Sequence, residues 1–578
     1  MKRWLKYVKP YWHYFVLGPL CMIVEVIGEV LMPRYLAAVI DGAGSSIGVS
    51  VGAMVMMIVT ALMMMAGGIG GAYFGAKAAI NFAVDLRRDT YLQIQSFSFA
   101  NMDKFRTGSL VTRLTNDVTQ MQNFINMLLR MALRSPGMLI GGLIMAITLQ
   151  PSLSVILAVT VPMLLLTIAL LIATAFPRFA RVQGAVDGLN ATVQENITNV
   201  RVVKSFVRED YECDKFGRAN SGLKAAGMHA TKLMILIMPL MNLFMYATII
   251  AVVFFGSGIV LEGDMQIGEL SAFITYVNQI LSSLMMVAML FMTTSRAMAS
   301  GNRIAEVLDE RSDISDVDAA YPMLSVMEGA VSFRDVTFRY YKENSEAVLN
   351  HINLEIPARS TVGIIGSTGC GKTTLVSMIP RLYDVDEGEV LIDGVNVRDY
   401  SLYNLREGVG MVLQKNVLFS GTIYDNLRFG DAEATDEEVQ RFATYAAADR
   451  FISSFKNGYD SEIEQGGANV SGGQKQRLCI ARALLKRPKV LILDDSTSAV
   501  DTATERQIQH ALATELQDCT KIIIAQRINS VKDADMIVVM EEGEITAIGK
   551  HAELLESSEA YREIYESQSS ATDEMEVG

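Results

Sequence analysis

The residues best suited to chemistry form the segment Gly366–Thr374, with the sequence Gly-Ser-Thr-Gly-Cys-Gly-Lys-Thr-Thr. Two glycines five positions apart, followed by Lys and Thr, match the phosphate-binding pattern. The apolar run 361–365 before the segment predicts a strand, and residues 374–382 after it predict a helix. Between such elements the glycines let backbone N–H groups point inward, where the positive end of the helix dipole adds to them. We therefore expect a nucleoside triphosphate site, with Lys372 on the outer phosphates and Thr373 on Mg²⁺.

Two later segments predict more of the same chemistry. Val490–Asp494 is typical of a buried parallel strand that ends in an acid, the usual place for the carboxylate on the Mg²⁺ side. The segment Val470–Arg477 predicts a helix start, at which Ser471 and glycine N–H groups form a second anion-binding site. One nucleotide rarely needs two such sites from one chain. The second site is therefore expected to cap a nucleotide held by another chain.

The elements that carry these motifs fall into two regions of different composition. The chain has 578 residues, of which 51% are hydrophobic, and four uncharged runs exceed the ~20 residues needed to cross a bilayer as a helix. Two weaker candidates that contain charges complete a set of six. The predicted spans lie at about 15–40, 49–76, 123–149, 152–176, 233–261 and 270–295. The predicted fold is a membrane α-helical bundle of six transmembrane helices followed by a cytoplasmic α/β phosphate-loop ATPase domain.

The boundaries follow from changes in sequence pattern. We expect a transmembrane domain over 1–309, a linker over 310–327, a nucleotide-binding domain over 328–567 and a polar tail without regular structure over 568–578. The long segments after spans 2 and 4 predict helices that continue into the cytoplasm. These helices should be joined by short caps near 101–108 and 209–216.

The distribution of charged residues predicts the orientation of the chain in the membrane, and the net charge argues against one class of partner. Lys and Arg gather before the first span and in the segments 77–130 and 178–232, whereas the short connections after spans 1, 3 and 5 have none. The positive-inside rule then places both termini in the cytoplasm of a multi-pass cell-membrane protein. The net charge of −13 argues against a nucleic-acid partner. The cysteines show neither paired spacing nor a metal motif, and Cys370 in the phosphate loop favours a reducing compartment.

In combination, the six spans and these motifs resemble a half-transporter of the ATP-binding cassette (ABC) exporter superfamily, in which two halves sandwich two ATP molecules. The resemblance covers nearly the whole chain and implies ATP and Mg²⁺ as cofactors. It implies that the following residues bind the nucleotide: Tyr340, Gly366, Ser367, Thr368, Gly369, Cys370, Gly371, Lys372, Thr373, Thr374, Gln414 and Asp494. Of these, Thr373, Gln414 and Asp494 would hold the metal ion. The family signature corresponds to Ser471, Gly472, Gly473 and Gln474, and the segment that crosses to the partner corresponds to Ser498–Asp501, including Asp501.

Two catalytic positions depart from the family pattern. Asp495 stands where the family usually has a Glu that polarises the attacking water, so its carboxylate is set back by about 1.5 Å. A displacement of that size can cost on the order of a hundredfold in rate. Gln526 stands where the family has a switch His, and an amide can hydrogen-bond but cannot carry a positive charge. The segment Glu464–Gly467 also differs from the usual Gly-Glu-Arg-Gly.

This pair of changes resembles the degenerate-site subunit of heterodimeric multidrug-type exporters, which binds ATP tightly and hydrolyses it poorly. The favoured hypothesis is therefore ATP-driven export of amphipathic or lipophilic compounds, with hydrolysis mainly at a composite site that a different half-transporter builds with this chain's signature. A homodimeric lipid or peptide exporter is one alternative. An ATP-gated regulatory membrane subunit that does not pump is another.

Glu25 and Glu29 in the first span leave two interpretations open. They lie four residues apart and share one helical face. Carboxylates at membrane depth usually face a polar cavity or a partner. They could line the substrate path and favour cations or exchange protons. Alternatively, they could lie near the headgroups or pair with Arg34.

Overall fold

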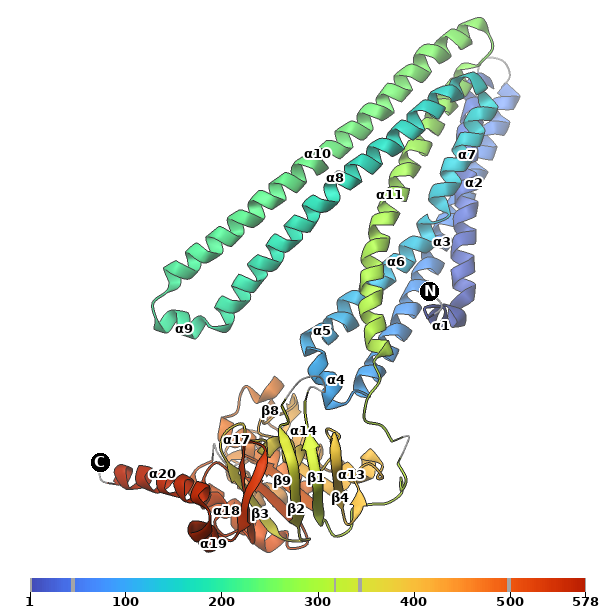
Figure 1. Cartoon of the computed structure of the whole chain (residues 1–578). Helices are drawn as coiled ribbons and strands as arrows, with labels where there is room; N and C mark the ends of the chain where they lie inside the picture. The colour runs from blue at the N-terminus through green and yellow to red at the C-terminus, as the bar shows by residue number, and fades with distance from the viewer. Residues whose placement is uncertain (1–2, 43–46, 317–318, 341–345, 496–499, 577–578) are drawn as a thin grey trace. The chain divides into compact units, whose positions relative to one another are not determined.

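The computed structural model describes the chain except for residues 1–2, 43–46, 317–318, 341–345, 496–499 and 577–578. It forms two compact units (Figure 1). The first contains Met1–Gln95 and Thr107–Glu310, and the second contains Ser96–Arg106 and Arg311–Gly578. The segment 96–106, which lies between two predicted spans in the sequence, thus groups with the second unit.

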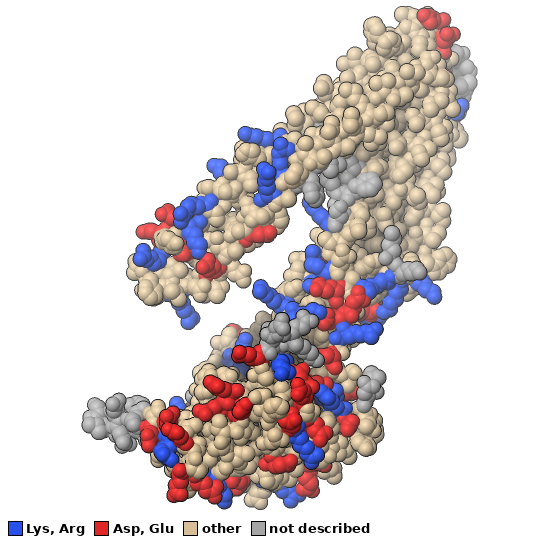
Figure 2. Space-filling model, in the orientation of Figure 1, with Lys and Arg blue, Asp and Glu red and all other residues tan. Residues whose placement is uncertain are grey.

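The described residues of the first unit are almost all helical, with short turns between the helices. Its elements are α1 (Leu5–Val8), η1 (Lys9–Tyr11), α2 (Trp12–Gly42), α3 (Ile47–Gln95), α5 (Thr107–Thr112), the π-helical turn η2 (Arg113–Asp117), α6 (Val118–Met131), α7 (Arg134–Leu149), α8 (Pro151–Thr198), α9 (Val200–Ser205), α10 (Glu209–Glu262) and α11 (Ile267–Asp309). Among the described residues, six helical segments are long and apolar enough to cross a membrane, which confirms the predicted bundle. Figure 2 shows that the upper part of this unit carries few charges on its visible face, apart from a few at its tip, and that basic residues appear about halfway down its left-hand arm.

The third predicted span, 123–149, is divided between α6 and α7. Pro136 explains the break, because proline has no N–H to donate to the carbonyl group four residues earlier, that of Ala132. The helical hydrogen-bond pattern is therefore interrupted at 132–133, although both residues keep right-handed helical dihedral angles, and a new helix begins at Arg134.

The helices α8 and α10 have 48 and 54 residues, so they are roughly 70–80 Å long, far more than the ~30 Å of a hydrocarbon core. They run side by side and are joined at one end through α9 (Figure 1). The cap predicted near 209–216 was therefore wrong in position. The acidic residues Glu209, Asp210 and Glu212 form the first turn of α10, where negative charge is favourable at a helix N-terminus.

The second unit contains two main sheets. Its strands are β1 (Val331–Phe338), β2 (Leu349–Ile356), β3 (Thr361–Gly366), β4 (Glu387–Ile392), β5 (Val395–Asn396), β6 (Val409–Val412), β7 (Gly421–Thr422), β8 (Glu462–Ile463), β9 (Val490–Asp494), β10 (Thr520–Ile524), β11 (Met536–Glu541) and β12 (Glu544–Gly549). In the described residues, one sheet has the order β12-β11-β3-β10-β9-β6 and the other β2-β1-β4-β5. Neighbouring strands from β11 to β6 are parallel, which confirms the predicted α/β domain.

Helices surround these sheets. They are α12 (Lys372–Ser377), α13 (Leu402–Gly408), α14 (Ile423–Arg428), α15 (Asp436–Tyr445), α16 (Asp449–Ile452), α17 (Gly472–Leu485), α18 (Thr502–Glu515), α19 (His551–Ser557) and α20 (Glu559–Glu576), together with short 3-10 turns. The tail over 568–578, which was expected to lack regular structure, instead continues α20 as far as Glu576. The periodic apolar residues Tyr561 and Ile564 pack this helix against the domain and so support its continuation.

The segment 96–106 contains the short helix α4 (Phe99–Lys104), which overlaps the first predicted cap. Ser98 and Asn101 close its first turn by a reciprocal capping box. The Tyr383 hydroxyl donates to Asp103 Oδ2 at 2.8 Å, and the Tyr383 ring meets the Phe99 ring edge to face. Inside the second unit, α4 therefore packs on the residues that follow the phosphate-loop helix.

Candidate nucleotide-binding site

The parallel strands β3, β10 and β9 are neighbours in the sheet, so the loops that follow them meet at one edge. Ile524 of β10 lies in register with Ile364 of β3 on one side and with Asp494 of β9 on the other. The phosphate loop follows β3, Asp495 follows β9 and Gln526 follows β10. Ligands of open α/β sheets bind at this carboxyl edge.

The phosphate loop needs glycine at two positions for steric reasons. A Cβ atom at Gly366 would lie 2.1 Å from the carbonyl oxygen of Met540 on the neighbouring strand β11. Gly371 has φ +96°, and a Cβ atom there would lie 2.9 Å from the Val348 oxygen. The loop therefore packs against the adjacent backbone and turns into α12 in a conformation that favours glycine.

Lys372 and Thr373, the first residues of α12, contact the phosphate loop and the acid Asp494, respectively. The Lys372 ammonium group donates to the carbonyl oxygens of Gly366 and Ser367 at 2.9 and 2.7 Å, across the curled loop. The Thr373 hydroxyl donates to Asp494 Oδ2 at 2.9 Å. Burial raises the pKa of Asp494, and the hydrogen bond from Thr373 opposes that shift.

The oxygen atoms beside Asp494 suit Mg²⁺, which prefers hard oxygen ligands. Gln414, an exposed residue just after β6, hydrogen-bonds Asp494 through its backbone and Asp495 through its side chain. The structure thus brings together Thr373, Asp494 and Gln414, the three predicted metal ligands. Their hydroxyl, carboxylate and carboxamide groups form a donor set that fits the ion.

Tyr340, the predicted adenine-stacking residue, lies beside the far end of the phosphate loop. Its hydroxyl shares a hydrogen bond of 3.0 Å with the Thr374 hydroxyl, and 42% of the residue is exposed. Its ring meets those of Phe338 and Tyr383 edge to face. These contacts hold the Tyr340 ring in a defined position beside the phosphate loop.

The two unusual residues contact each other directly. The Gln526 amide donates from Nε2 to Asp495 Oδ2 at 2.8 Å, and the Asp495 backbone N–H donates to the Ile524 oxygen at 3.1 Å. Burial raises the pKa of Asp495, while hydrogen bonds from Gln526 and Gln414 and the charge of Lys372 oppose the shift. The backbone at Asp495 has φ 48°, a left-handed conformation that Asp tolerates better than most residues.

The predicted signature forms the start of α17. Ser471 is exposed and caps the helix, because its Oγ accepts from the Gln474 N–H at 3.3 Å while Gln474 Oε1 accepts from the Ser471 N–H at 2.9 Å. A Cβ atom at Gly472 would meet no atom within 4 Å, so this helix start is open. The segment Glu464–Gly467, which departs from the family pattern, contacts this helix, because the Lys475 ammonium group donates to the Gly466 oxygen at 2.7 Å.

Comparisons with known proteins agree with this architecture. Residues 15–284 match the family model described as the ABC transporter transmembrane region, and residues 349–498 match the family model described as ABC transporter. The chain is 37% identical over 571 residues to the uncharacterized ABC transporter ATP-binding protein YfiB of Bacillus subtilis (strain 168), an alignment that covers 98% of each chain. The chain belongs to the ABC transporter family.

Other relatives of this ABC transporter have more specific names. It is 34% identical over 484 residues to the ATP-dependent lipid A-core flippase of Desulfotalea psychrophila, with 84% of each chain covered. It is 34% identical over 472 residues to the fatty acid ABC transporter ATP-binding/permease protein of Mycobacterium bovis, with 82% of this chain and 74% of the relative covered. A solved structure of a bacterial Atm1-family ABC exporter with ATP bound superposes with a TM-score of 0.78 at 25% identity and covers 96% of this chain and 98% of that chain.

These findings give the coarse function. The chain is an ABC exporter half-transporter, a multi-pass membrane protein whose ATPase domain binds ATP and couples hydrolysis to transport. Exporters of this architecture act as dimers. The roles of single residues in this chain remain predictions that the geometry makes specific.

The segment predicted to cross to the partner is only partly described. Ser498 and Ala499 lie outside the described residues, whereas Asp501 is described and caps α18. Its carboxylate accepts from the Thr504 N–H at 3.0 Å and from the Thr504 hydroxyl at 2.7 Å. Asp501 therefore has a local structural role in addition to the predicted one.

In the first unit, Glu25 and Glu29 of α2 form ion pairs with Arg134 of α7. Arg134 Nη1 lies 2.9 Å from Glu25 Oε1, and Nη2 lies 3.1 Å from Glu29 Oε2. The cation that contacts Glu29 thus comes from another helix and is not Arg34, the partner considered in the sequence. Gln279 of α11 also reaches the cluster by donating to the Glu29 backbone oxygen at 2.9 Å.

Sequence reasoning missed several contacts because their partners are far apart in the chain. Gln476 of α17, which is buried, donates to the Asp495 backbone oxygen at 3.2 Å and so connects the signature helix to the acid. Gln568 of α20 bonds to the backbone around Gln526. Neither Gln476 nor Gln568 carries a signal in the sequence that predicts these contacts.

Proposed function

We propose that this chain is the degenerate half of a heterodimeric exporter for amphipathic or lipophilic compounds. In this proposal the chain binds MgATP at its own phosphate loop and hydrolyses it slowly. Its signature, Ser471–Gln474, completes a faster site built mainly by a different half-transporter with the usual Glu and His. The substrate class follows the relatives named as a lipid A-core flippase and a fatty acid transporter.

The observation that carries the proposal is the hydrogen bond between Gln526 and Asp495. A general base must accept a proton from water, and a positioned base is typically worth about 10²–10⁴ in rate. Here the carboxylate is one carbon–carbon bond shorter than Glu, and one of its oxygens already accepts from an amide. Gln526 cannot lose or gain a proton near neutral pH. Its hydrogen bond to Asp495 therefore persists across the pH range in which a histidine would change its charge.

The neighbouring geometry supports slow turnover with retained binding. The phosphate loop, Lys372 and the Thr373–Asp494 pair keep the arrangement expected of a nucleotide and Mg²⁺ site. The signature helix start is open and capped, so it can receive a phosphate from a facing domain. Binding groups are thus intact, while the pair that would activate water is altered.

The membrane part of the proposal concerns Glu25, Glu29 and Arg134. Two carboxylates face one guanidinium, which leaves a formal excess of one negative charge in a predicted span. We place this cluster on the substrate path, where it would favour cationic compounds. Replacing both glutamates with glutamine should weaken transport of cations more than that of neutral substrates, whereas equal losses would indicate a folding role.

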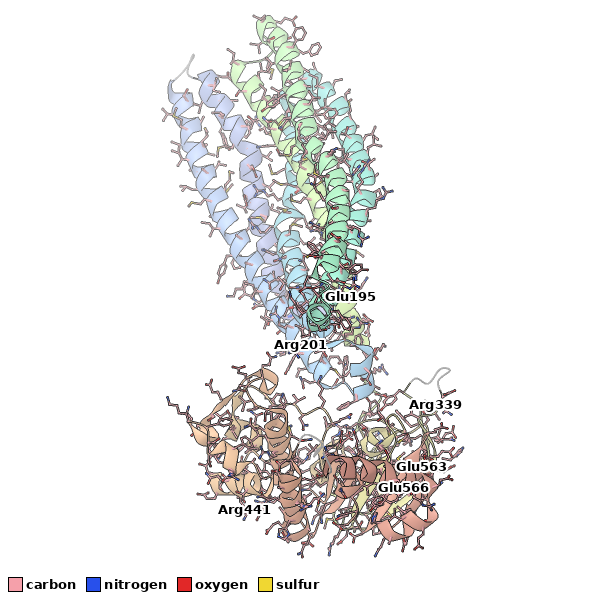
Figure 3. All side chains as sticks on the ribbon, turned by 90° about the vertical axis from the view of Figure 1, so that its left-hand side faces the viewer. Glu195, Arg201, Arg339, Arg441, Glu563 and Glu566 are labelled. Atoms are coloured by element: carbon pink, nitrogen blue, oxygen red, sulfur yellow. The ribbon has the colours of Figure 1, made fainter. Side chains whose placement is uncertain are left out.

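Topology is proposed from the positive-inside pattern. Both termini would lie on the cytoplasmic side of the cell membrane, as would the end of the α8–α10 pair that carries α9. Figure 3 shows the charged residues Glu195 and Arg201 at that end. Accessibility tags at Gln150 and Gly263 should then label from outside, and a tag at Ser221 from inside. Outside labelling at Ser221 would refute the topology.

The decisive experiment purifies this chain together with the half-transporter from a neighbouring gene and compares two variants. Asp495→Asn should lower ATPase activity of the pair by a small fraction, because a site slowed about a hundredfold contributes about one per cent of turnover. Ser471→Arg should abolish turnover, because a bulky side chain at the helix start prevents closure on the partner's ATP.

Nucleotide binding to this chain, measured alongside, should persist in both variants. Near-total loss of turnover from Asp495→Asn would instead make Asp495 a working base. Full activity of this chain purified alone would favour a homodimer. Substrate-stimulated ATPase activity of the pair would exclude a regulatory subunit that does not pump.

A further inference from the structure

We infer that Gln568 of the C-terminal helix α20 is a positioning residue for Gln526 at this chain's nucleotide site. The inference rests on the proposed function, in which Gln526 pairs with Asp495 at a site that retains its nucleotide, and it deepens that proposal. It gives the last helix of the chain a part in nucleotide retention, although the sequence suggested only a polar tail there.

The side-chain amide of Gln568 forms two hydrogen bonds with the backbone of the loop after β10. Gln568 Nε2 donates to the Gln526 backbone oxygen at 2.7 Å, and Gln568 Oε1 accepts from the Ile528 N–H at 2.9 Å. The two bonds lie on either side of Arg527, so the side chain pairs with the loop as a neighbouring strand would. Both polar ends of the amide are thereby used on one target.

The helix that carries Gln568 is firmly anchored to the domain. Tyr561 of α20 is fully buried, and it packs in one cluster with Ile365 at the end of β3 and Ile528 in the gripped loop. The Tyr561 hydroxyl also shares a hydrogen bond of 2.8 Å with His551 Nδ1 in α19. The anchor therefore touches the strand before the phosphate loop as well as the loop after β10.

A continuous set of contacts connects Tyr561 of α20 to Asp495. On its strand side, the loop is held because the Ala525 N–H donates to the Ile364 oxygen at 3.2 Å. On its other side it is held by Gln568, so the backbone of Gln526 is fixed at both ends. Its flexible side chain then starts from a defined point and meets Asp495 Oδ2 at 2.8 Å. Loss of the grip should leave the fold intact but widen the positions that the Gln526 amide samples.

The test measures how long this chain retains nucleotide in the full-length transporter. 8-Azido-ATP is bound, chased with excess ATP and cross-linked by light at intervals, and the subunits are then separated on a gel. Gln568→Ala should speed release from this chain about tenfold, the loss expected from two neutral hydrogen bonds that act through one side chain. Gln568→Glu should behave similarly, because a carboxylate can accept from Ile528 but cannot donate to the Gln526 oxygen.

A double-mutant cycle separates positioning from general stabilisation. If Gln568 acts through Gln526, Gln526→Ala should also speed release, and adding Gln568→Ala to it should produce no further change. Glu563→Ala is the matched control, because Glu563 is an exposed residue of the same helix (Figure 3). It should release nucleotide at the parent rate, and all variants should melt at the parent temperature.

The outcomes distinguish the two levels of the proposal. If Gln526→Ala speeds release and Gln568→Ala does not, positioning by α20 is overturned and the role of Gln526 stands. Additive effects would likewise overturn positioning, since α20 would then act by another route. If Gln526→Ala changes neither release nor turnover, the proposed role of Gln526 at the nucleotide site fails, and the inference about Gln568 fails with it.

Discussion

Removing the Arg134 side chain should destabilise the membrane domain far more than removing another arginine nearby. Arg134 bridges Glu25 and Glu29 at 2.9 and 3.1 Å and thereby joins α7 to α2. Substitution Arg134→Leu would leave two carboxylates on one helical face without their cation. Carboxylates at membrane depth are costly when they lack a partner.

The magnitude follows from burial. The side chains of Arg134, Glu25 and Glu29 are 26%, 14% and 23% exposed, so the pairs are largely but not fully buried. Breaking a buried pair by removing one partner costs about 3–5 kcal/mol, and the partial exposure points to the lower end, about 3 kcal/mol. Replacing all three residues with Gln removes the charges together and should cost much less, because no uncompensated charge remains.

The measurement is thermal unfolding of the purified transporter in lipid nanodiscs. Arg134→Leu should lower the apparent melting temperature by several degrees, and the triple Gln variant should recover most of the loss. Arg130→Leu serves as the control, since Arg130 is an exposed residue on the preceding helix α6. Equal shifts for Arg134→Leu and Arg130→Leu, or a triple variant worse than the single one, would refute the assignment of Arg134 as the charge that balances the cluster.

Three further predictions concern the nucleotide site. Asp495→Glu combined with Gln526→His should raise hydrolysis at this chain's site by about ten- to a hundredfold in single-turnover assays, with either change alone giving less. Gly371→Ala should abolish nucleotide binding, because alanine is strained at φ +96° and its Cβ would lie 2.9 Å from the Val348 oxygen; equilibrium binding of a fluorescent ATP analogue tests this. Burial raises the pKa of Asp495, so its ionised form is lost at a higher pH than that of a free Asp as the medium is acidified. The acid limb of the residual single-turnover rate should therefore lie at a higher pH than for a free Asp, and in Asp495→Asn it should move to that of Asp494, whose pKa burial also raises.

Local patterns were enough to predict the elements that dominate the fold. Long uncharged runs predicted the helices. The phosphate-loop helix was predicted over 374–382 and is found at Lys372–Ser377, and the helix opened by the signature is found at Gly472–Leu485. Both signals lie within a few turns of chain, where sequence spacing and spatial spacing agree. The break before Arg134 was also readable in principle from Pro136, but the apolar residues on both sides of it suggested one continuous span.

Contacts between distant segments could not be predicted in this way. Arg34 is the nearest arginine to Glu29 in the sequence, yet Arg134 makes the ion pair because α7 packs against α2. The cap near 209–216 was misplaced for a related reason. Acidic residues suit both an exposed cap and the first turn of a helix, and only the packing of α10 on α8 shows which they form.

The two catalytic departures illustrate what the structure adds to such a pattern. Separately, a shortened acid and a missing histidine each imply a weaker site, and the sequence does not show whether one depends on the other. The register of β9, β10 and β3 brings their loops together, and Gln526 then donates to the same carboxylate that would have to accept a proton from water. A carboxylate that keeps this bond has one oxygen fewer for activating water. We therefore predict that Asp495 and Gln526 act as one unit, so that the effect on hydrolysis of changing both residues differs from the sum of the two single effects.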